Sequence, residues 1–319
     1  MKTKSFHLLM ILFLLFSILL LISCNSNIEI NTQYSYSNAE SYLVGNGSFD
    51  ASTIKHIDID WISGNIIIDR SSDNNISFIE EIDENLSDDL KLHYFLNGNT
   101  LYIKFAKATK LLSFNGNKKN LYIKIPSSIV LDSFFCNMVS ANITIKNLNA
   151  DTVHIDSVSG IIYNYNVTSK FVTLDSTSGN IMAKGLISKD LSIDSTSGKV
   201  TLENVNCEEI DIETTSGDIS TTNVETLSLS ADSSSSVVTL RFKTIPTEVE
   251  VNTISGDIYL FLPKETKFMM NYDTVSGEFT HTFALSKSDS NLFDYSTEDP
   301  SSKVIIESIS GNLDIDYSN

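Results

Sequence analysis

The chain has 319 residues with 41% hydrophobic content, and its 40 acidic and 22 basic residues give a formal net charge of -18. This hydrophobic content suffices for a folded core and excludes a chain that is disordered throughout. The charge excludes nucleic acid as an expected partner because phosphates would be repelled, and bulk acidity of this kind mostly serves the solubility of an exported protein.

A short apolar segment follows two lysines at the N-terminus. Lys2 and Lys4 precede an apolar run from Leu8 to Ile22, which only Ser17 interrupts. The run is shorter than the ~20 residues that a membrane-spanning helix needs, and it has the length of a secretion signal. The segment therefore predicts export.

The apolar run ends at a cysteine. Residues 21–24, Leu-Ile-Ser-Cys, resemble the lipobox of bacterial lipoprotein signals, with an aliphatic residue three positions before the cysteine and a small residue directly before it. The resemblance implies that residues 1–23 are a lipoprotein signal peptide and that Cys24 is the lipidation site, so that lipid anchors the protein to a membrane. Residues 24–50, rich in Asn, Ser and Tyr, are then predicted to be a spacer. The alternatives are an ordinary signal peptide and a buried thiol at Cys24.

Residues 51–319 are predicted to form one β-solenoid domain, whose beginning is irregular. Residues 57–68 alternate apolar and polar side chains around a Ser-Gly pair. Residues 70–131 contain strand-like pieces, such as 101–105 and 121–126, without a regular spacing. Because the terminal repeats of solenoids are atypical, we predict that residues 70–131 form a capping elaboration.

Residues 132–240 are the regular part of the domain, where a five-residue loop recurs every 19 residues. The six loops are 137–141, 156–160, 175–179, 194–198, 213–217 and 232–236. Apolar residues stand seven and five positions before the last residue of each loop and two positions after it, which is the alternation of β-strands. Such a coil buries its inward side chains only when other coils stack on it. The pattern predicts an all-β fold, a parallel β-solenoid (β-helix) with about 19 residues per coil and an irregular N-terminal capping region.

A column of acidic residues accompanies the loops, and we call it the carboxylate ladder. Its members, four positions before the last residue of each loop or its equivalent, are Asp60, Asn137, Asp156, Asp175, Asp194, Glu213, Asp232, Asn252, Asp273 and Glu307. Stacked coils would bring like charges to about one strand spacing, which is destabilising. Two alternatives offset this repulsion: hydrogen bonds from the backbone amides of each turn, with water screening the column, or Ca²⁺ bound along it. The glycine-rich nonapeptide of calcium β-rolls is absent, which favours the first alternative.

The repeat pattern continues to the C-terminus with irregular spacing. Ser-Gly pairs stand at 255–256, 276–277 and 310–311, each followed two positions later by an apolar residue. Residues 281–303, rich in Ser and Asp, are predicted to be an excursion before the final coil.

No catalytic, cofactor-binding or metal-binding residue is predicted. The sequence has no Gly-x-Ser-x-Gly, His-Glu-x-x-His, Gly-rich phosphate loop or Cys-x-x-Cys motif, and its five histidines show no metal-ligand spacing. An alternative is a glycosidase pair formed by Asp175 and Asp194. Catalysis needs carboxylates in unlike environments, and the repeat makes theirs alike, so we predict that the protein is not an enzyme.

The two cysteines beyond Cys24 are predicted to be free thiols. Cys136 and Cys207 fall at different positions of their repeats and would not meet in adjacent coils, so no disulfide is expected. Cys136 occupies an inward column, which indicates a buried thiol.

Three features resemble one known family. They are the Ser-Gly-Asn/Asp-Ile loops, the segment Leu-Tyr-Ile-Lys-Ile-Pro at 121–126 and the closing segment 305–315. They resemble the bacterial β-strand-repeat family labelled "putative adhesin", a domain of unknown function, over about residues 50–319. The resemblance implies a β-solenoid at the cell envelope without catalytic residues, and some relatives are linked to sensing envelope stress.

Two functional classes remain. The first is an envelope-anchored, adhesin-like binding protein or scaffold, whose ligand is a glycan or another envelope protein. The second is a regulatory lipoprotein that responds to envelope stress through a protein partner. Both place the exported, lipid-anchored chain at the bacterial cell envelope, on a membrane or the cell surface, and neither needs a cofactor. Exposure to the medium separates the two classes.

Overall fold

The computed structural model describes residues 34–82, 86–108, 118–287 and 294–318. The predicted signal peptide and Cys24 lie outside these residues, so lipidation stays a prediction. Three short 3-10 helices, η2 (Ala39–Ser41), η3 (Ala51–Thr53) and η4 (Asp88–Leu90), are the helical elements of the described part, and strands make up most of the rest. No helix among the described residues is long and apolar enough to cross a membrane.

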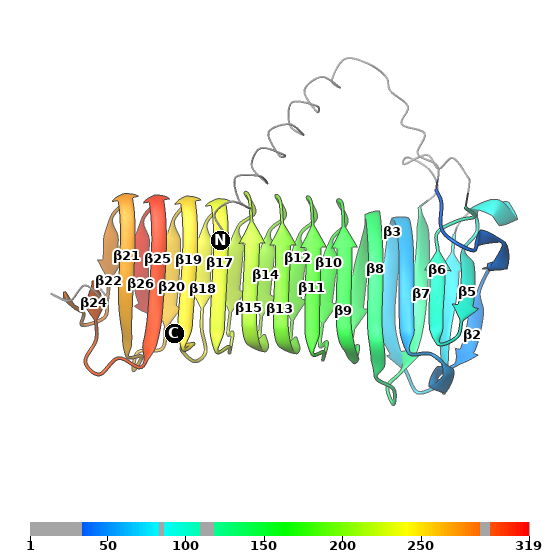
Figure 1. Ribbon diagram of the computed structural model, residues 1–319, viewed down its shortest axis with the longest axis horizontal. Coiled ribbons are helices and arrows are strands. Elements are labelled where there is room, and N and C mark those ends of the chain that lie inside the picture. The colour runs from blue at the N-terminus through cyan, green and yellow to red at the C-terminus, as the bar shows by residue number, and fades with distance from the viewer. Residues whose placement is uncertain (1–33, 83–85, 109–117, 288–293, 319) are drawn as a thin grey trace, which may run out of the picture.

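The strands stack into a rod in which each regular coil supplies one longer and one shorter strand (Figure 1). The longer strands are β9 (Ala150–Ser157), β11 (Phe171–Ser176), β13 (Ile187–Ser195), β15 (Asn206–Thr214), β17 (Ser228–Ser235) and β19 (Glu248–Ser255). The shorter strands are β10 (Ile162–Tyr165), β12 (Ile181–Lys184), β14 (Val200–Glu203), β16 (Ile219–Thr222), β18 (Val238–Arg241) and β20 (Ile258–Leu262). We call the outward surfaces of the two sets the long-strand face and the short-strand face.

Every regular coil pairs in parallel with the next, one repeat along the chain. Leu174 on β11 lies opposite Ile155 on β9 and Ile193 on β13, each 19 residues away. From β17 to β19 the offset is one residue larger, since Leu229 pairs with Val249. The prediction of a parallel β-solenoid with about 19 residues per coil is confirmed.

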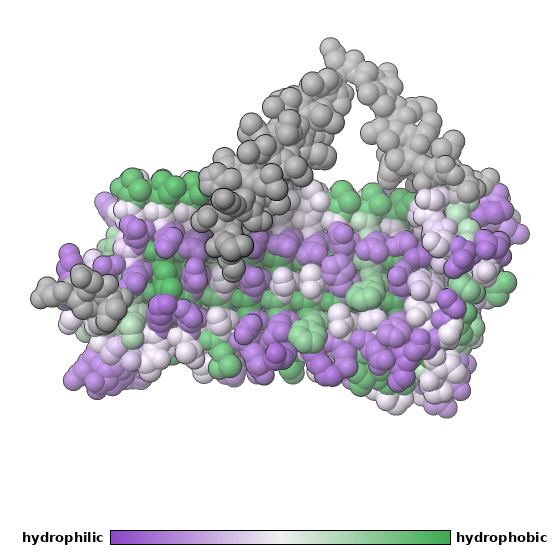
Figure 2. All heavy atoms as spheres, in the orientation of Figure 1, coloured by the Kyte–Doolittle hydropathy of each residue, from purple (hydrophilic) through white to green (hydrophobic). Residues whose placement is uncertain are grey.

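The core lies between the two faces. Inward side chains stack in columns that follow the rod axis, and Ile155, Leu174 and Ile193 are at most 1% exposed. Each such side chain contributes roughly 1.5–3 kcal/mol when it leaves water. Because the alternation has a period of two, hydrophilic side chains form parallel bands along the outside (Figure 2).

The corner after each longer strand depends on a hydroxyl and a glycine. The hydroxyl of Ser176 accepts the N–H of Gly179 at 2.8 Å, and Thr214 makes the same contact with Gly217 at 2.9 Å. A Cβ added at Gly179 would lie 1.9 Å from the carbonyl oxygen of Gly160 in the neighbouring coil. The close stacking of corners therefore requires glycine there, which explains the Ser-Gly pairs of the repeat.

At both ends the coils are not stacked in chain order. Strand β25 (Ser302–Ser310) lies between β19 and β21 (Phe268–Ser276), and it pairs in parallel with both. Strand β26 (Leu313–Tyr317) lies likewise between β20 and β22 (Phe279–His281). The last coil of the chain is therefore the penultimate coil of the rod (Figure 1).

The N-terminal end mirrors this arrangement. Strand β3 (His56–Ser71) lies between β8 (Leu131–Lys146) and an outer coil formed by β6 (Thr100–Lys104) and β7 (Lys119–Pro126). The outer coil is covered by antiparallel strands: β5 (His93–Asn97) on β6 and β4 (Asn75–Glu81) on β7. Strands β1 (Leu43–Val44) and β2 (Gly47–Asp50) extend this cover, so part of the predicted spacer pairs with it. We call β1, β2, β4 and β5 the N-terminal cap.

Two short strands from the segment 281–303 lie at the other end of the rod. Strands β23 (Ser286–Lys287) and β24 (Tyr295–Ser296) form an antiparallel pair, and β24 pairs with the start of β21.

A buried ion pair joins β7 to the N-terminal cap. The Lys119 side chain is fully buried, and its Nζ lies 2.5 Å from Oε1 of Glu80 on β4. The ammonium also donates to the carbonyl oxygens of Leu90 and Phe105 and lies 4.0 Å from the centre of the Phe105 ring. Burial lowers the pKa of Lys119 to about 8, against the opposing effect of Glu80.

We predict that this lysine makes stability rise at alkaline pH. Between pH 8 and 10.5 the unfolded chain binds more protons at Lys119 than the folded chain, so the free energy of unfolding increases with pH. Urea unfolding midpoints at pH 8, 9 and 10 should increase more in the wild type than in Lys119→Met. Exposed Lys199→Met is the control and should follow the wild type, whereas equal slopes in all three proteins would contradict the prediction.

A second prediction concerns a buried amide. Asn164 on β10 is fully buried between Ile145 and Ala183, and neither of its amide atoms has a partner among the described residues. Replacing it by Val should raise the free energy of unfolding by about 1–2 kcal/mol, because an unpartnered buried polar group is removed.

The same core column supplies a matched control. Thr221 is equally buried, but its hydroxyl accepts the N–H of Arg241 at 2.9 Å. Thr221→Val should therefore destabilise by about 1 kcal/mol, although it is nearly isosteric. Chemical denaturation of both variants measures the difference, and a loss of stability in Asn164→Val would mean that the amide is satisfied, for instance by a buried water molecule.

Candidate functional site

The strand register aligns the carboxylate ladder along the entire rod. Asp175 lies directly opposite Asp156 and Asp194, and the pairing continues through every coil in both directions. In rod order the members are Asp60, Asn137, Asp156, Asp175, Asp194, Glu213, Asp232, Asn252, Glu307 and Asp273. The predicted column is thus present. Glu307 precedes Asp273 in it because β25 lies between β19 and β21.

A groove of about 980 Å³ follows this ladder between Asp156 and Asp273, and we call it the carboxylate groove. The ladder forms one side, and the hydroxyl residues that follow it, such as Ser176 and Thr214, contribute to the lining. The residues at the corner after each longer strand form the rim. In the middle coils the corner residue is polar, as at Thr177. The groove therefore offers carboxylate and hydroxyl oxygens in a repeated, linear arrangement.

The rim becomes apolar toward the C-terminal end. Ile254, Ile309 and Val275 occupy the corner position in three consecutive coils, with 45%, 52% and 81% of their surface exposed. One part of the carboxylate groove therefore combines acidic and aliphatic contacts.

Outside the middle of the ladder, an ion pair and hydrogen bonds offset the charge of two carboxylates, Asp60 and Asp232. At the N-terminal end, Lys104 lies 2.6 Å from Asp60, and the Asn137 amide donates to Asp60 at 3.0 Å. Farther along, the Asn252 amide donates to Asp232 at 2.8 Å. The two asparagines of the ladder thus replace carboxylates where a hydrogen bond to the neighbouring coil can form.

The middle of the ladder retains its repulsion. The pKa of Asp175 is raised, first by burial and further by Asp194 and Asp156, while His154 at 4.0 Å opposes the rise. Burial also raises the pKa of Asp194. Both shifts mean that the charged form of these carboxyl groups is disfavoured in the fold.

The hydrogen bonds observed near the ladder differ from those that we predicted. We expected each carboxylate to accept backbone amides of its own turn, but at Gly179 and Gly217 the hydroxyl one residue after the ladder position accepts the N–H. Oδ1 of Asp175 has no hydrogen-bond partner among the described residues. The prediction was therefore wrong for Asp175, because Ser176 lies closer to the inside of the turn and takes the donor.

The other predicted residues do not form a reactive site. Cys136 and Cys207 are both free and buried, and burial raises the pKa of Cys136 above its usual range and that of Cys207 to about 12. The described residues contain no cluster of three or more His, Cys, Asp or Glu side chains that could hold a metal ion.

Comparisons with known proteins place the chain in a family. The model of the Toastrack DUF4097 family matches residues 54–316. No curated protein matches the sequence.

The comparison with solved structures found proteins from three bacteria. A "putative lipid binding protein" of Parabacteroides distasonis is 16% identical, with 86% of this chain and 96% of that chain covered and a TM-score of 0.50. A "putative adhesin" of Bacteroides fragilis is 14% identical, with 86% and 96% covered and a TM-score of 0.44. A "putative cell adhesion protein" of Clostridium sporogenes is 10% identical, with 87% and 100% covered and a TM-score of 0.26. The first of these likenesses shows a shared fold only.

We predict that neutralising the middle of the ladder stabilises the protein. Asp175→Asn removes one of five consecutive stacked carboxylates and should raise the free energy of unfolding at pH 7 by about 0.5 kcal/mol, with a smaller gain in high salt. Asp232→Asn is the control, because Asp232 accepts a hydrogen bond from Asn252 and should gain less. Thermal unfolding with Ca²⁺ and with chelator completes the test. A chelator-sensitive wild type and a destabilised Asp175→Asn would instead support the calcium alternative.

Proposed function

The chain belongs to the Toastrack DUF4097 family, and we propose that it is a non-catalytic, lipid-anchored β-solenoid of the bacterial cell envelope. In this proposal Cys24 carries the lipid, and the carboxylate groove binds an extended ligand, either a glycan or a segment of another envelope protein. The proposal assigns no cofactor, metal ion or catalytic residue.

The observation that carries the proposal is the length and regularity of the groove. Eight ladder positions from Asp156 to Asp273 line it, and seven steps of ~4.8 Å correspond to about 34 Å. Small-molecule sites are usually enclosed clefts with a few convergent polar groups, whereas this groove repeats one chemistry along a line. An extended chain with repeating hydroxyl, amide or cationic groups fits such a surface best.

The chemistry of the lining supports binding without reaction. The carboxylates of Asp156, Asp175 and Asp194 occupy equivalent positions of successive coils, and His154 lies 4.0 Å from Asp175. The groove therefore repeats one acidic group along a line and does not combine the two unlike carboxyl environments that acid–base catalysis uses. Carboxylate and hydroxyl oxygens accept hydrogen bonds from ligand O–H and N–H groups, and the carboxylates attract cations. The surface is therefore suited to recognition.

One experiment tests both the anchor and the groove. Cys24→Ala should appear in the culture medium, whereas Cys207→Ala, which alters a buried thiol, should remain cell-associated. The released Cys24→Ala protein is then added to cells that lack the gene, where only a ligand, not the lipid, retains it. We expect retention by intact cells, and we expect Asp156→Lys/Asp194→Lys to reduce it at least tenfold because two of the seven carboxylates that line the groove become cations.

The control places two lysines on the other face. Thr201→Lys/Thr222→Lys, on the short-strand face, should bind cells as Cys24→Ala alone does. Equal loss in both double variants would show that net charge and not the groove determines binding. Retention by opened envelopes but not by intact cells would contradict the surface-binding role and would favour the regulatory lipoprotein.

A further inference from the structure

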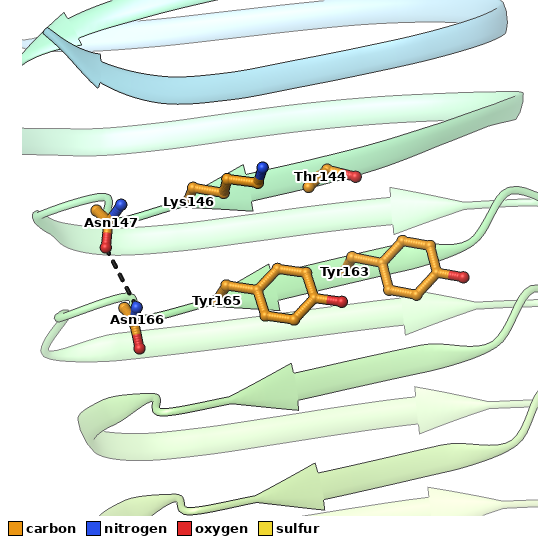
Figure 3. A pocket seen from close by; sticks show the side chains of 6 residues that line it. All are labelled: Thr144, Lys146, Asn147, Tyr163, Tyr165 and Asn166. Carbon is orange, nitrogen blue, oxygen red and sulfur yellow. Dashed lines mark hydrogen bonds between the residues drawn. The ribbon is translucent and has the colours of Figure 1, made fainter.

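The short-strand face carries a pair of coplanar aromatic rings. Tyr163 and Tyr165 both point outward from β10, and their ring centres lie 6.2 Å apart with only 9° between the ring planes. Figure 3 shows the two rings side by side, next to a pocket of about 460 Å³. This volume lies within the range of ~300–1,000 Å³ that is usual for small-ligand sites.

The two rings are held in place by their strand, but their hydroxyl groups make few hydrogen bonds to the described residues. Tyr163 pairs in register with Thr144 and Tyr165 with Lys146, while the core residues beneath them fix β10. Among the described residues, the hydrogen-bond partner of the Tyr165 hydroxyl is the sulfur of Met182, at 3.8 Å, and sulfur is a weak acceptor. The Tyr163 hydroxyl has no hydrogen-bond partner in the described part of the chain. Two aromatic faces and two hydroxyl groups are therefore available to a ligand.

Polar side chains surround the rings on a rigid frame. Asn147 and Asn166 occupy the next corner, both in the left-handed conformation with φ of 57° and 52°. The Asn166 amide donates to the Asn147 side-chain oxygen at 3.3 Å, as drawn in Figure 3. Thr144 adds a hydroxyl and Lys146 an ammonium group to the same pocket.

The charge around the pocket is opposite to that of the protein. The outward positions of the coils from β7 to β14 on this face carry four lysines and two carboxylates: Lys124, Lys146, Lys184, Lys199, Asp69 and Glu203. Lys184 pairs with Glu203 at 2.7 Å and Lys124 with Asp69 at 3.4 Å. Lys146 has no ion-pair partner among the described residues, although the whole chain has a net charge of -18. This part of the short-strand face therefore favours an anionic ligand.

We propose that Tyr163, Tyr165 and Lys146 form a binding site for a carboxylated saccharide. The apolar C–H face of a pyranose ring stacks on the flat tyrosine rings, whose faces carry the negative part of the aromatic quadrupole. Lys146 pairs with the sugar carboxylate, and the asparagine and threonine side chains bind ring hydroxyls. The site lies on the opposite face from the carboxylate groove, so it goes beyond the proposed function and does not depend on it.

The rod contains an internal comparison for this site. Tyr259 and Phe261 on β20 occupy the same two columns as Tyr163 and Tyr165, farther along the rod. The guanidinium carbon of Arg241 lies 3.3 Å from the centre of the Phe261 ring and covers it. Only the pair on β10 therefore offers both of its rings to a ligand.

The test measures binding of two named polysaccharides to the full chain in detergent. Affinity electrophoresis with polygalacturonate, which is carboxylated, and with dextran, which is neutral, should show binding to polygalacturonate. Tyr163→Thr/Tyr165→Thr should raise the Kd at least tenfold, and threonine is already tolerated in these columns at Thr201 and Thr222. Lys146→Gln should abolish the preference for polygalacturonate and weaken the dependence of binding on salt.

Tyr259→Thr/Phe261→Thr is the matched control and should leave the Kd within twofold of the wild type. Thermal unfolding of each variant separates loss of binding from loss of fold. The proposal is overturned if the wild type binds neither polysaccharide, if both double variants lose binding equally, or if dextran binds as tightly as polygalacturonate. These outcomes do not bear on the groove, which the cell-binding experiment tests with other variants.

Discussion

Parallel backbone pairing between successive coils is the constraint on which the rest of the structure depends. Each regular coil hydrogen-bonds to the coils on either side, and a 19-residue offset keeps the same side chains opposite one another. Inward columns become a continuous core, and outward columns repeat one chemistry at ~4.8 Å. The stacked carboxylates at Asp156, Asp175 and Asp194 are a consequence of this register. Burial and repulsion both disfavour the charged form of these carboxyl groups, as the raised pKa of Asp175 shows. The fold tolerates this cost because the buried columns beneath hold the coils together.

A regular stack must also end, and this rod ends differently on its two sides. At the N-terminus the outermost strands β6 and β7 are both covered by antiparallel strands of the N-terminal cap. At the other end β24 covers β21 at Met269 and Met270, and it also pairs with the short strand β23. The first and last coils of the chain lie one step inside, so the ends of the repeat domain are held on both sides. Open edges invite pairing with other chains, and covering them limits such pairing.

The sequence predicted the features that depend on the 19-residue period, and it missed those that depend on the order in which the coils stack. The offset of 19 residues and the glycine corners follow from local spacing, so the coils and the ladder could be aligned before the structure was known. The insertion of β25 between β19 and β21 could not be predicted, because its partners are 55 and 34 residues away. No local pattern distinguishes this order from a stack in which the coils follow one another along the chain. The role of Ser176 in the turn was missed for a related reason: several oxygens stand near each corner, and only geometry decides which accepts the amide.

The site at Tyr163 and Tyr165 shows which features can be predicted from a repeat and which cannot. Aligning the coils places Tyr163 and Tyr165 at outward positions where the other regular coils mostly carry small or charged residues, so a departure from the repeat was the available signal. The net positive charge of that region, by contrast, comes from Lys146 and Lys199, because Glu203 offsets Lys184 and Asp69 offsets Lys124. One face of the rod therefore carries a row of carboxylates by repetition, interrupted at Asn137 and Asn252, while the other acquires a local positive patch by variation. Since the core separates the two faces, the two proposed ligands, which differ in charge, would not compete for one surface.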